Sequence, residues 1–323
     1  MKRGLVIGRF MPLHKGHVAL VHFAAQWCDE LIVSMTYTPG DRIPGPLRFE
    51  WLEKEFESLQ NVRLEILLDP FDDESIPIID RLPRWSAFLK EKIPAIQVVF
   101  SSGEYGFQLA QHLAVPHIAF DLDRRNAPVS STLILAHPFR YWEFIATPAR
   151  GYFVKKICFY GPESTGKSTL AKQLADIYHT EFVPEVSREM ITSNDFTIDD
   201  IIRIGKAQTE RVINKSMSAN KILLCDTDLI TTQIYCRHYL KEVPPILFQL
   251  EKEVTYDLYF LFDIDVPWVA DGLRDLAEKR LEMFHVFKDE LEKRKINYDL
   301  VKGNYSERET QIIKKLNQYL LDE

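Results

Sequence analysis

Two stretches of this chain combine residue types and spacings that could do chemistry on phosphate groups. One of them reads Gly161-Pro-Glu-Ser-Thr-Gly166-Lys167-Ser168 and fits the P-loop pattern G-x-x-x-x-G-K-[ST]. Glycines in such a loop let successive backbone N–H groups point at one anion, and the following helix adds its partial positive charge. We expect Lys167 to reach the β- and γ-phosphates of ATP, and Ser168 to bind Mg²⁺. The residues expected to contact ATP are Gly161, Glu163, Ser164, Thr165, Gly166, Lys167, Ser168 and Thr169.

The other stretch lies near the N-terminus and contains two histidines three residues apart, His14 and His17. It follows a short apolar segment, residues 5–7, and precedes apolar residues at helical spacing, so we expect His17 at or near a helix N-terminus. Two imidazoles held there can both donate N–H groups to phosphate oxygens. They would stabilise charge on a transferring nucleotidyl group without a covalent intermediate. The alternative is a turn with two solvated histidines.

The elements that would position these residues follow from the alternation of apolar runs with helical patterns. We expect strands in the first half at residues 5–7, 31–35, 63–68, 96–101 and 117–120, and in the second half at 156–160, 181–185, 221–225, 258–264 and 297–301. This alternation predicts an α/β protein with two doubly wound parallel sheets, whose ligands bind at the carboxyl ends of strands. The length of 323 residues favours two domains, which we place at residues 1–150 and 151–323.

Further candidates in the first half are polar residues at strand ends and helix starts. Arg48 opens a predicted helix, where a solvated cation is the more ordinary interpretation. Asp121 and Arg124 follow the fifth strand, and hydroxyl groups from Ser130 to Thr132 precede another helix. Such hydroxyls can cap the helix or bind phosphate at its N-terminus, and capping is the more common role.

The second half has acidic residues at or directly after the ends of two predicted strands. Glu185 ends one of them and Arg188 comes soon after, and Asp226 and Asp228 follow the next. Because a carboxylate at a strand end beside a P-loop can hold Mg²⁺, we expect Asp226 or Asp228 to join Ser168 in a metal site. Either aspartate could instead cap the following helix.

Arginines after the strand at 258–264 are candidates for a lid over the phosphates, as in small-molecule kinases. Arg274 lies in a turn near a glycine and is the stronger candidate, whereas Arg280 lies on a charged helical segment and could equally be solvated. The last helix is expected to open with a capping box formed by Ser306 and Glu309 and to serve packing alone.

Composition excludes several classes of protein. The formal net charge of −7 gives no overall attraction to nucleic acid, although a nucleotide needs only a few cations at one site. Four cysteines without a C-x-x-C pair argue against a structural zinc site or a disulfide framework. The sequence shows neither a signal segment nor a membrane-spanning run, so we expect a cytoplasmic protein. We also expect no bound prosthetic group.

The first stretch resembles the G-x-F-x-P-x-H-x-G-H signature of the HIGH-type nucleotidyltransferase superfamily. The matching residues are Gly8, Phe10, Pro12, His14, Gly16 and His17. Members of this superfamily have a Rossmann-like fold and transfer an adenylyl or cytidylyl group with release of pyrophosphate. The resemblance implies an ATP site made by Gly8, Arg9, Phe10, His14, His17, Ser130 and Thr132.

Over essentially its whole length the chain resembles the NadR family of bifunctional nicotinamide-nucleotide (NMN) adenylyltransferases and ribosylnicotinamide kinases. The resemblance is carried by GRFMPLHKGH, Asp121-x-x-Arg124 with VSST after it, HPFRYWEF, GPESTGKST, Glu185-Val-Ser-Arg188-Glu189, DTDLITTQ and WVADGLRDL. It implies that the second domain phosphorylates nicotinamide riboside with Mg-ATP, and that the first converts NMN and ATP to NAD.

The family also implies roles for single residues of this chain. Lys167 and Glu185 would act in phosphoryl transfer, and His14 and His17 in adenylyl transfer. The riboside would be bound by Glu185, Arg188 and Asp226, NMN or its phosphate by Arg48, Trp85, Asp121 and Arg124, and the kinase ATP also by Arg274. Trp268 or Tyr235 could stack on nicotinamide, although core packing is the more ordinary role of such residues.

Three departures from the family pattern modify these expectations. The position of Leu135 is an arginine in the family's S-x-T-x-x-R motif, and its loss predicts a weakened adenylyltransferase. Of the family's tryptophan-bearing segment for the nicotinamide pocket, only Trp85 is present. The nucleotidyltransferase motif begins within ten residues of Met1, so we expect no helix-turn-helix domain before it and no DNA binding.

Two other functions remain open on sequence grounds. A fusion of phosphopantetheine adenylyltransferase with dephospho-coenzyme A kinase would also join the two motifs, although DTDLITTQ and HPFRYW speak against it. A kinase whose first domain senses nucleotides without catalysis is the second alternative, and it is motivated by Leu135.

Overall fold

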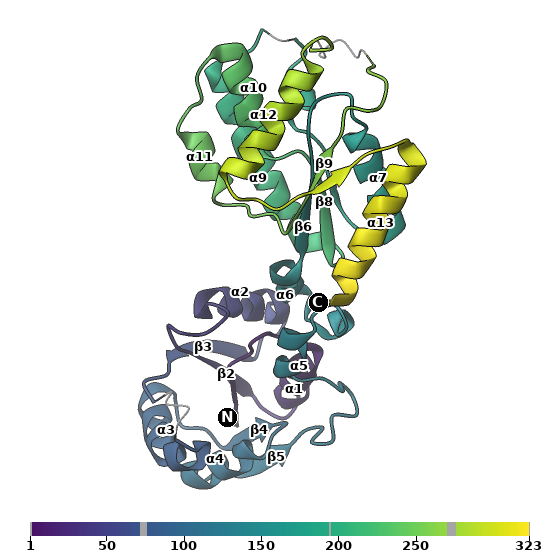
Figure 1. The fold of residues 1–323 in the computed structure, drawn as a ribbon. Helices are drawn as coiled ribbons and strands as arrows, with labels where there is room; N and C mark the ends of the chain where they lie inside the picture. The colour runs from purple at the N-terminus through teal and green to yellow at the C-terminus, as the bar shows by residue number, and fades with distance from the viewer. Residues whose placement is uncertain (1, 72–75, 194, 270–275, 323) are drawn as a thin grey trace. The chain divides into compact units, whose positions relative to one another are not determined.

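The chain folds into two compact units, and the boundary between them falls after Arg150. The computed structural model describes residues 2–71, 76–193, 195–269 and 276–322. Each unit is built on a five-stranded parallel sheet. The two units and most of their strands and helices are labelled in Figure 1. The expected α/β class with two parallel sheets is therefore confirmed. Within the described ranges, no helix is both long enough and apolar enough to cross a membrane.

The sheet of the first unit has the order β3-β2-β1-β4-β5 with all neighbours parallel. Its strands are β1 (Arg3–Gly8), β2 (Glu30–Tyr37), β3 (Val62–Leu68), β4 (Val98–Ser101) and β5 (His117–Ala119). Its helices are α1 (Lys15–Ala25), α2 (Gly45–Phe56), α3 (Ile78–Lys92), α4 (Tyr105–Leu113), α5 (Ser131–Ala136), the short 3₁₀ helix η1 (Trp142–Phe144) and α6 (Thr147–Phe153), which crosses the boundary. The strand order reverses between β1 and β4, which is where doubly wound sheets bind ligands.

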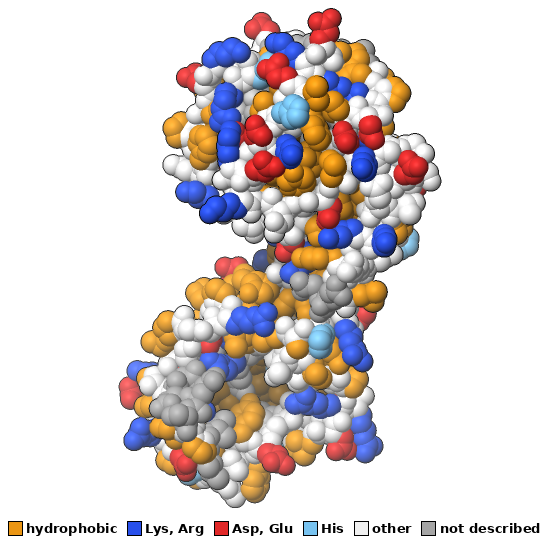
Figure 2. Space-filling model, viewed as in Figure 1, with side chains coloured by type: hydrophobic (Ala, Val, Ile, Leu, Met, Phe, Trp, Pro, Cys, Tyr) orange, Lys and Arg blue, Asp and Glu red, His pale blue; other side chains and the backbone are white. Residues whose placement is uncertain are grey.

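The core of the first unit forms where the apolar strands meet the helices. Leu5, Ile32 and Val99 of three adjacent strands pack against Leu82 and Leu89 of α3, and all five side chains are buried. On the face shown in Figure 2 this unit is hollowed, and hydrophobic side chains line the hollow.

The aromatic segment between the first sheet and the second is packed. Phe139 and Trp142 are almost completely buried, and their rings meet edge to face. The backbone next to Trp142 pairs with the histidine stretch: the N–H of Ala146 donates to the carbonyl of Leu13 at 3.2 Å. This segment therefore supports the turn that carries His14.

The sheet of the second unit has the order β10-β9-β6-β8-β7, again with parallel neighbours. Its strands are β6 (Lys155–Tyr160), β7 (Phe182–Val183), β8 (Ile222–Asp226), β9 (Leu258–Phe262) and β10 (Asp299–Val301). Its helices are α7 (Lys167–Tyr178), α8 (Ser187–Met190), α9 (Ile198–Ser218), α10 (Leu229–Leu240), α11 (Ile246–Glu251), α12 (Arg280–Lys293) and α13 (Tyr305–Asp322). The strand that precedes the P-loop, β6, is the central one.

Alternating residues of β6 face the two halves of the core, because successive side chains of a strand point to opposite faces. Ile157 and Phe159 belong to one buried cluster, which contains residues of α7 and α13. Cys158 and Tyr160 belong to the other, which contains residues of α10 and α12. The P-loop is thus anchored on a strand that is buried on both sides.

The capping box expected at Ser306 and Glu309 is wrong by two residues. The N–H of Glu307 donates to the side chain of Asn304 at 3.1 Å, and the Asn304 N–H donates to the Glu307 carboxylate at 2.8 Å. Helix α13 therefore starts at Tyr305, because the turn at Gly303 has a positive φ of 95° that places Asn304 as the cap.

Candidate active sites

The histidine turn places both imidazoles at the start of α1, directly after the central strand β1. His14 is the N-cap of α1, and its Nδ1 accepts a hydrogen bond from the N–H of Gly16 at 3.1 Å. The rings of His14 and His17 stack with centroids 3.7 Å apart. Since Nδ1 of His14 accepts, its proton resides on Nε2, which can donate to a phosphate oxygen.

Both histidines are held in the neutral form. Burial, together with a smaller effect of the positive charge of Arg124, lowers the pKa of His14 to about 4. Burial also lowers the pKa of His17 well below its ordinary value, with added contributions from His14 and Arg124. The alternative of two solvated histidines is therefore wrong, since His14 is only 7% exposed. In this site the imidazoles supply N–H groups and Arg124 supplies the positive charge.

Arg48 is completely buried, so its interpretation as a solvated helix cation is wrong. Its guanidinium forms an ion pair with Asp41 and donates to the backbone carbonyls of Ile43, at 2.9 Å, and Arg9. Asp41 also pairs with the side chain of Arg9. Arg48 is buried because α2 packs against β2 and β3. Its guanidinium lies between α2 and β2, where it also contacts the carbonyl of Thr36, and it extends to Arg9 before the histidine turn. Arg48 therefore fixes the backbone at Arg9.

Other candidates of the first unit have structural contacts. The carboxylate of Asp121 accepts from the N–H groups of Arg125 and Asn126, at 2.8 and 3.0 Å, and so closes a turn. Ser130 caps α5 by accepting from the N–H of Leu133 at 3.2 Å, which is the capping alternative. Thr132 is exposed.

Trp85 and Leu135, the two residues named where the sequence departs from the family pattern, make the following contacts. Trp85 lies on α3 and meets the rings of Phe71 and Phe88 edge to face, at centroid distances of 6.2 and 5.6 Å. The carbonyl of Leu135 on α5 accepts a long hydrogen bond, 3.5 Å, from the guanidinium of Arg42. The structure thus shows packing for Trp85 and a cation beside the backbone of Leu135.

The P-loop connects β6 to α7 with the backbone conformation that its glycines permit. Gly161 and Gly166 have φ values of +134° and +85°. A Cβ atom at Gly161 would lie 3.0 Å from the carbonyl oxygen of Phe262, so no larger residue fits there without displacement. Lys167 is buried at the start of α7, and its Nζ donates to the carbonyl of Pro162 at 2.7 Å. The expected strand, loop and helix are thus confirmed.

Two arginines hold the outer side of the P-loop. Arg308 of α13 donates to the carbonyl of Thr165 at 2.6 Å and pairs with Asp265. Arg280 of α12 donates to the carbonyl of Ser164 at 3.0 Å. Carbonyl groups of the loop are thereby satisfied by guanidinium donors, which suits a loop whose N–H groups serve an anion.

These contacts decide whether Arg280 is solvated or bound to the P-loop. The solvated alternative for Arg280 is wrong, because its side chain is half-buried and bound to the loop. Arg274 lies outside the described residues. Arg308 was missed by sequence reasoning, since its pairing with Thr165 spans 143 residues and leaves no local signal.

Asp226 ends β8 beside the start of α7 and has the surroundings of a metal ligand. Burial, with a contribution from the nearby charge of Glu185, raises its pKa to about 6, whereas Lys167 and a hydrogen bond to Ser168 act in the opposite direction. Its Oδ1 is buried and has no hydrogen-bond partner among the residues described. An oxygen ligand without a partner, next to the P-loop serine, fits Mg²⁺.

Asp228 is a helix cap, which is the alternative expected for one of the two aspartates. Its Oδ1 accepts from the N–H and the hydroxyl of Thr231, at 2.9 and 3.0 Å, and the hydroxyl of Tyr259 donates to its Oδ2 at 3.0 Å. Both carboxylate oxygens are therefore engaged. Only Asp226 of this pair remains a metal ligand candidate.

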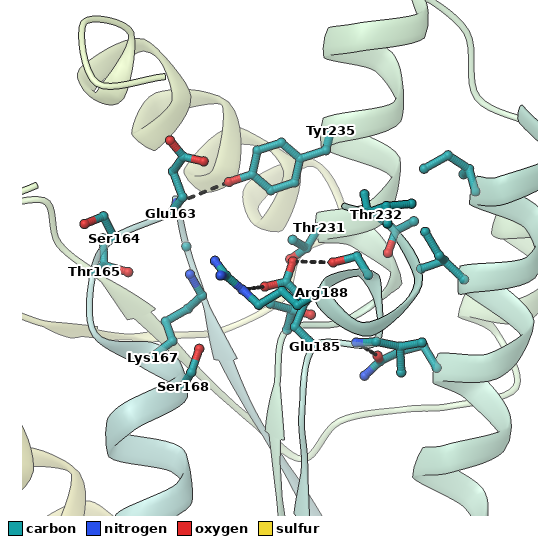
Figure 3. A pocket seen from close by; sticks show the side chains of 18 of the residues that line it. Glu163, Ser164, Thr165, Lys167, Ser168, Glu185, Arg188, Thr231, Thr232 and Tyr235 are labelled. Atoms are coloured by element: carbon teal, nitrogen blue, oxygen red, sulfur yellow. Dashed lines mark hydrogen bonds and ion pairs between the residues drawn. The ribbon is translucent and has the colours of Figure 1, made fainter. Parts of the chain in front are cut away.

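A pocket of about 160 Å³ joins the P-loop to helices α8, α9 and α10. In Figure 3, Lys167 and Arg188 point into it from opposite sides. Its polar lining beyond the P-loop comprises Glu185, Ser187, Arg188, Gln208, Thr227, Thr231, Thr232 and Tyr235, and its apolar lining Val186, Ile191, Phe196, Ile201, Ile204 and Tyr239. The phosphate loop thus faces a recess with both charged and apolar walls.

The charged wall of this recess is formed by an ion pair between Arg188 and Glu185. Arg188 and Glu185 form an ion pair of 3.0 Å, and the hydroxyl of Ser187 donates to the other carboxylate oxygen of Glu185 at 2.8 Å. Tyr235 lies across the recess, where its hydroxyl accepts from the N–H of Glu163 at 3.2 Å, as Figure 3 shows. Trp268 is not among the residues that line the pocket.

Sequence reasoning missed the contribution of α9 to the pocket. Ile201, Ile204 and Gln208 fall on one face of this helix, at spacings of three and four residues. A polar glutamine within an otherwise apolar stripe was the signal that could have identified it.

Comparisons with known proteins cover both units. A family model described as "AAA domain" matches residues 156–308. The protein "Trifunctional NAD biosynthesis/regulator protein NadR" of Escherichia coli (strain K12) is 30% identical, and the match covers 91% of this chain and 77% of that protein. Its namesake in Salmonella typhimurium is 32% identical over 85% of this chain and 72% of that protein.

The first unit and the whole fold have further counterparts. A nicotinamide-nucleotide adenylyltransferase of Pyrococcus furiosus is 30% identical over 49% of this chain and 85% of that protein. The solved structure "Crystal structure of NadR protein in complex with NR" superposes with a TM-score of 0.83 at 22% identity, and covers 99% of this chain and 96% of that chain. That likeness shows a common fold. Because the chain is at least 30% identical to two NadR proteins and covers more than two thirds of each, it belongs to the NadR family of NAD biosynthesis proteins.

Proposed function

We propose that this protein makes NAD in two ATP-dependent steps, one in each unit. The second unit phosphorylates nicotinamide riboside to NMN, and the first unit joins NMN to the adenylyl group of a second ATP. Membership of the NadR family and the similarity of the first unit to nicotinamide-nucleotide adenylyltransferases support both activities. The observation that carries the kinase is the pocket that joins Lys167 to Glu185 and Arg188.

In the kinase step the 5′-hydroxyl oxygen of the riboside attacks the γ-phosphorus of ATP. Its proton passes to the Glu185 carboxylate, and ADP leaves. Lys167 and the loop N–H groups hold the phosphates, while Arg188 fixes Glu185 through their ion pair. Because the transition state is loose, positioning and charge contribute more than the base. The apolar wall of the pocket suits the pyridine ring.

The kinase also needs Mg²⁺, which we assign to Ser168 and Asp226. When bound, the ion neutralises charge between the β- and γ-phosphates. The unpartnered Oδ1 of Asp226 supports this assignment, as does the hydrogen bond between Ser168 and the carboxyl group of Asp226. Among the described residues there is no group of three or more His, Cys, Asp or Glu side chains that could hold a metal by themselves. The ion would therefore bind together with ATP.

In the adenylyltransferase step a phosphate oxygen of NMN attacks the α-phosphorus of ATP, and pyrophosphate leaves. His14 donates from Nε2 to the phosphate, and Arg124 lies close enough to both histidines to lower their pKa values. Gly8, Arg9 and Phe10 form the turn that places them. No proton needs to move, because the attacking oxygen is already ionised at neutral pH.

The test is a product assay on the whole protein. Nicotinamide riboside, ATP and Mg²⁺ are supplied, and NMN and NAD are quantified separately over time. We expect NMN to appear first and NAD to follow. Dephospho-coenzyme A, offered in place of the riboside, should not be phosphorylated. Formation of NMN without NAD would contradict the proposed adenylyltransferase activity, and the absence of both products would contradict the whole proposal.

A cytoplasmic location is part of the proposal. All four cysteines, Cys28, Cys158, Cys225 and Cys236, are free thiols, as is usual in a reducing compartment.

A further inference from the structure

Gln208 is a buried amide whose two ends have different surroundings. It lies on α9, is 3% exposed and lines the kinase pocket. Its Oε1 accepts from the N–H of Val186 at 3.1 Å. A backbone N–H can only donate, so this bond fixes which end of the amide is the oxygen. The Nε2 end is buried and has no hydrogen-bond partner in the described parts of the chain.

An unpaired buried donor is unfavourable unless something supplies an acceptor. The neighbours of Gln208 on α9 are Ile204, one turn before it, and Ile201, two turns before it, which both line the pocket. These apolar side chains offer no acceptor. The Nε2 group is therefore an unused donor at the edge of an apolar wall, which matches a flat ring that carries an acceptor oxygen.

The other bond of Gln208 connects this wall to the chemistry. Val186 follows Glu185 directly, and the Glu185 carboxylate is held by Ser187 and Arg188. An amide that binds both the substrate and the Val186 N–H would fix the distance between the ring and the carboxylate. Substrate recognition and the placement of Glu185 then depend on the same side chain.

We propose that Gln208 is a specificity-determining residue of the kinase, whose Nε2 donates to the carboxamide carbonyl of the riboside's pyridine ring. The inference rests on the proposed riboside kinase activity. It predicts that the enzyme distinguishes ribosides by the ring substituent, and that the discrimination resides in this donor.

One competing arrangement exists for the Nε2 group. Gln208 also borders a smaller cavity of about 20 Å³, together with Thr209, Asp228 and Tyr256. That space holds about one water molecule, which could accept the hydrogen bond. In that arrangement Gln208 would affect stability but not the recognition of the ring.

The first test uses the unaltered enzyme and two substrates. Nicotinamide riboside is compared with the riboside of pyridine, which has the same ring and charge but no carboxamide. We expect the KM for the pyridine riboside to be at least about tenfold higher, with a similar kcat. Equal KM values would overturn the proposal. If neither riboside is phosphorylated, the proposed kinase activity fails instead.

The second test uses Gln208→Glu at pH 8, which keeps an acceptor for the Val186 N–H but loses the donor. We expect its KM for nicotinamide riboside to rise about tenfold and to approach that for the pyridine riboside, while the KM for ATP stays unchanged. Gln249→Glu, an exposed position on α11, controls for the added charge. Equal rises for both ribosides, or a lower Tm with wild-type KM values, would overturn the proposal.

Gln208→Met separates recognition from positioning. This variant loses both hydrogen bonds, so we expect the KM effect of Gln208→Glu together with a fall in kcat for both ribosides, because Val186 and Glu185 are no longer fixed. A fall in kcat without any change in the KM ratio would show a positioning role alone and would contradict the proposal.

Discussion

Arg308 donates a hydrogen bond of 2.6 Å to the carbonyl oxygen of Thr165, although 143 residues separate them. Through this bond the last helix of the chain, α13, holds the loop that binds ATP. The same guanidinium donates to the carbonyls of Gly303 and Asp263, at 2.8 and 3.0 Å, and pairs with Asp265. The P-loop geometry therefore depends on a residue that lies outside its own motif.

Removing this guanidinium should weaken both stability and nucleotide binding. For Arg308→Met we expect the free energy of unfolding to fall by about 3 kcal/mol, because three backbone carbonyls, one of them buried, lose a charged donor and Asp265 loses its partner. Arg308→Lys keeps the charge without the planar fork and should recover only part of this. Denaturant unfolding measures the change. Wild-type stability in the methionine variant would contradict the role of Arg308.

Asp226 and Asp228 form a natural pair for separating a metal ligand from a helix cap. Asp226→Asn should lower the kinase kcat by about a hundredfold or more, since an amide cannot replace a carboxylate on Mg²⁺. Asp228→Asn should retain most of the activity, because asparagine also caps helices well. Both rates are measured across a Mg²⁺ titration. Equal losses in the two variants would mean that the assignment of the two residues is wrong.

The buried histidines predict a loss of stability in mild acid. The folded pKa of His14 is about 4, below the ordinary 6.5, so between these values the unfolded chain binds more protons than the folded one. The free energy of unfolding should therefore decrease as the pH is lowered from about 6.5 to 4, by up to about 3 kcal/mol from this residue. Unfolding curves recorded at several pH values test the slope.

The matched control for this prediction is Arg124→Gln. Arg124 contributes to lowering the pKa of both His14 and His17, so the variant should raise the imidazole pKa values and make stability less sensitive to pH. NMR titration of the imidazoles measures this shift directly. An unchanged pKa for His14 would show that burial alone is responsible.

Leu135 gives a prediction of gain rather than loss. It stands where the family motif has an arginine, and the nearest cation shown at its backbone is Arg42, at 3.5 Å. Leu135→Arg should raise the rate of NAD formation from supplied NMN severalfold, while leaving the kinase rate unchanged. The same rate in the variant would show that this chain needs no cation from α5.

The sequence was sufficient to predict features that depend on short-range patterns. The ten strands of the described ranges were all expected, although several bounds differ by a few residues. The two motifs follow central strands, because a strand, a glycine-rich turn and a helix are adjacent in sequence. Asp228 could not be separated from Asp226 in this way, since their roles depend on the direction of each side chain. The cap at Asn304 was missed because two overlapping segments both match a capping box.

The remaining failures share one physical cause. Arg48 and Arg308 are charged residues on helices, which are usually solvated, and only their partners show that they are buried. Those partners, Asp41 and Asp265, come from other elements of the fold. Gln208 stands out in sequence as a polar residue in an apolar stripe of α9, but only the fold shows that it lines the kinase pocket. Long-range partners of buried polar groups were thus the part that sequence patterns could not provide.

The central claim is that each unit carries one activity, and variants that disable one site test it most directly. Lys167→Ala should reduce NMN formation from nicotinamide riboside by about a hundredfold or more, yet make NAD from supplied NMN at the wild-type rate. His17→Ala should show the reverse. The measurement is the separate quantification of NMN and NAD from each substrate. This clean separation is the predicted result. NMN formation by Lys167→Ala at the wild-type rate, or unchanged NAD synthesis by His17→Ala, would contradict the account.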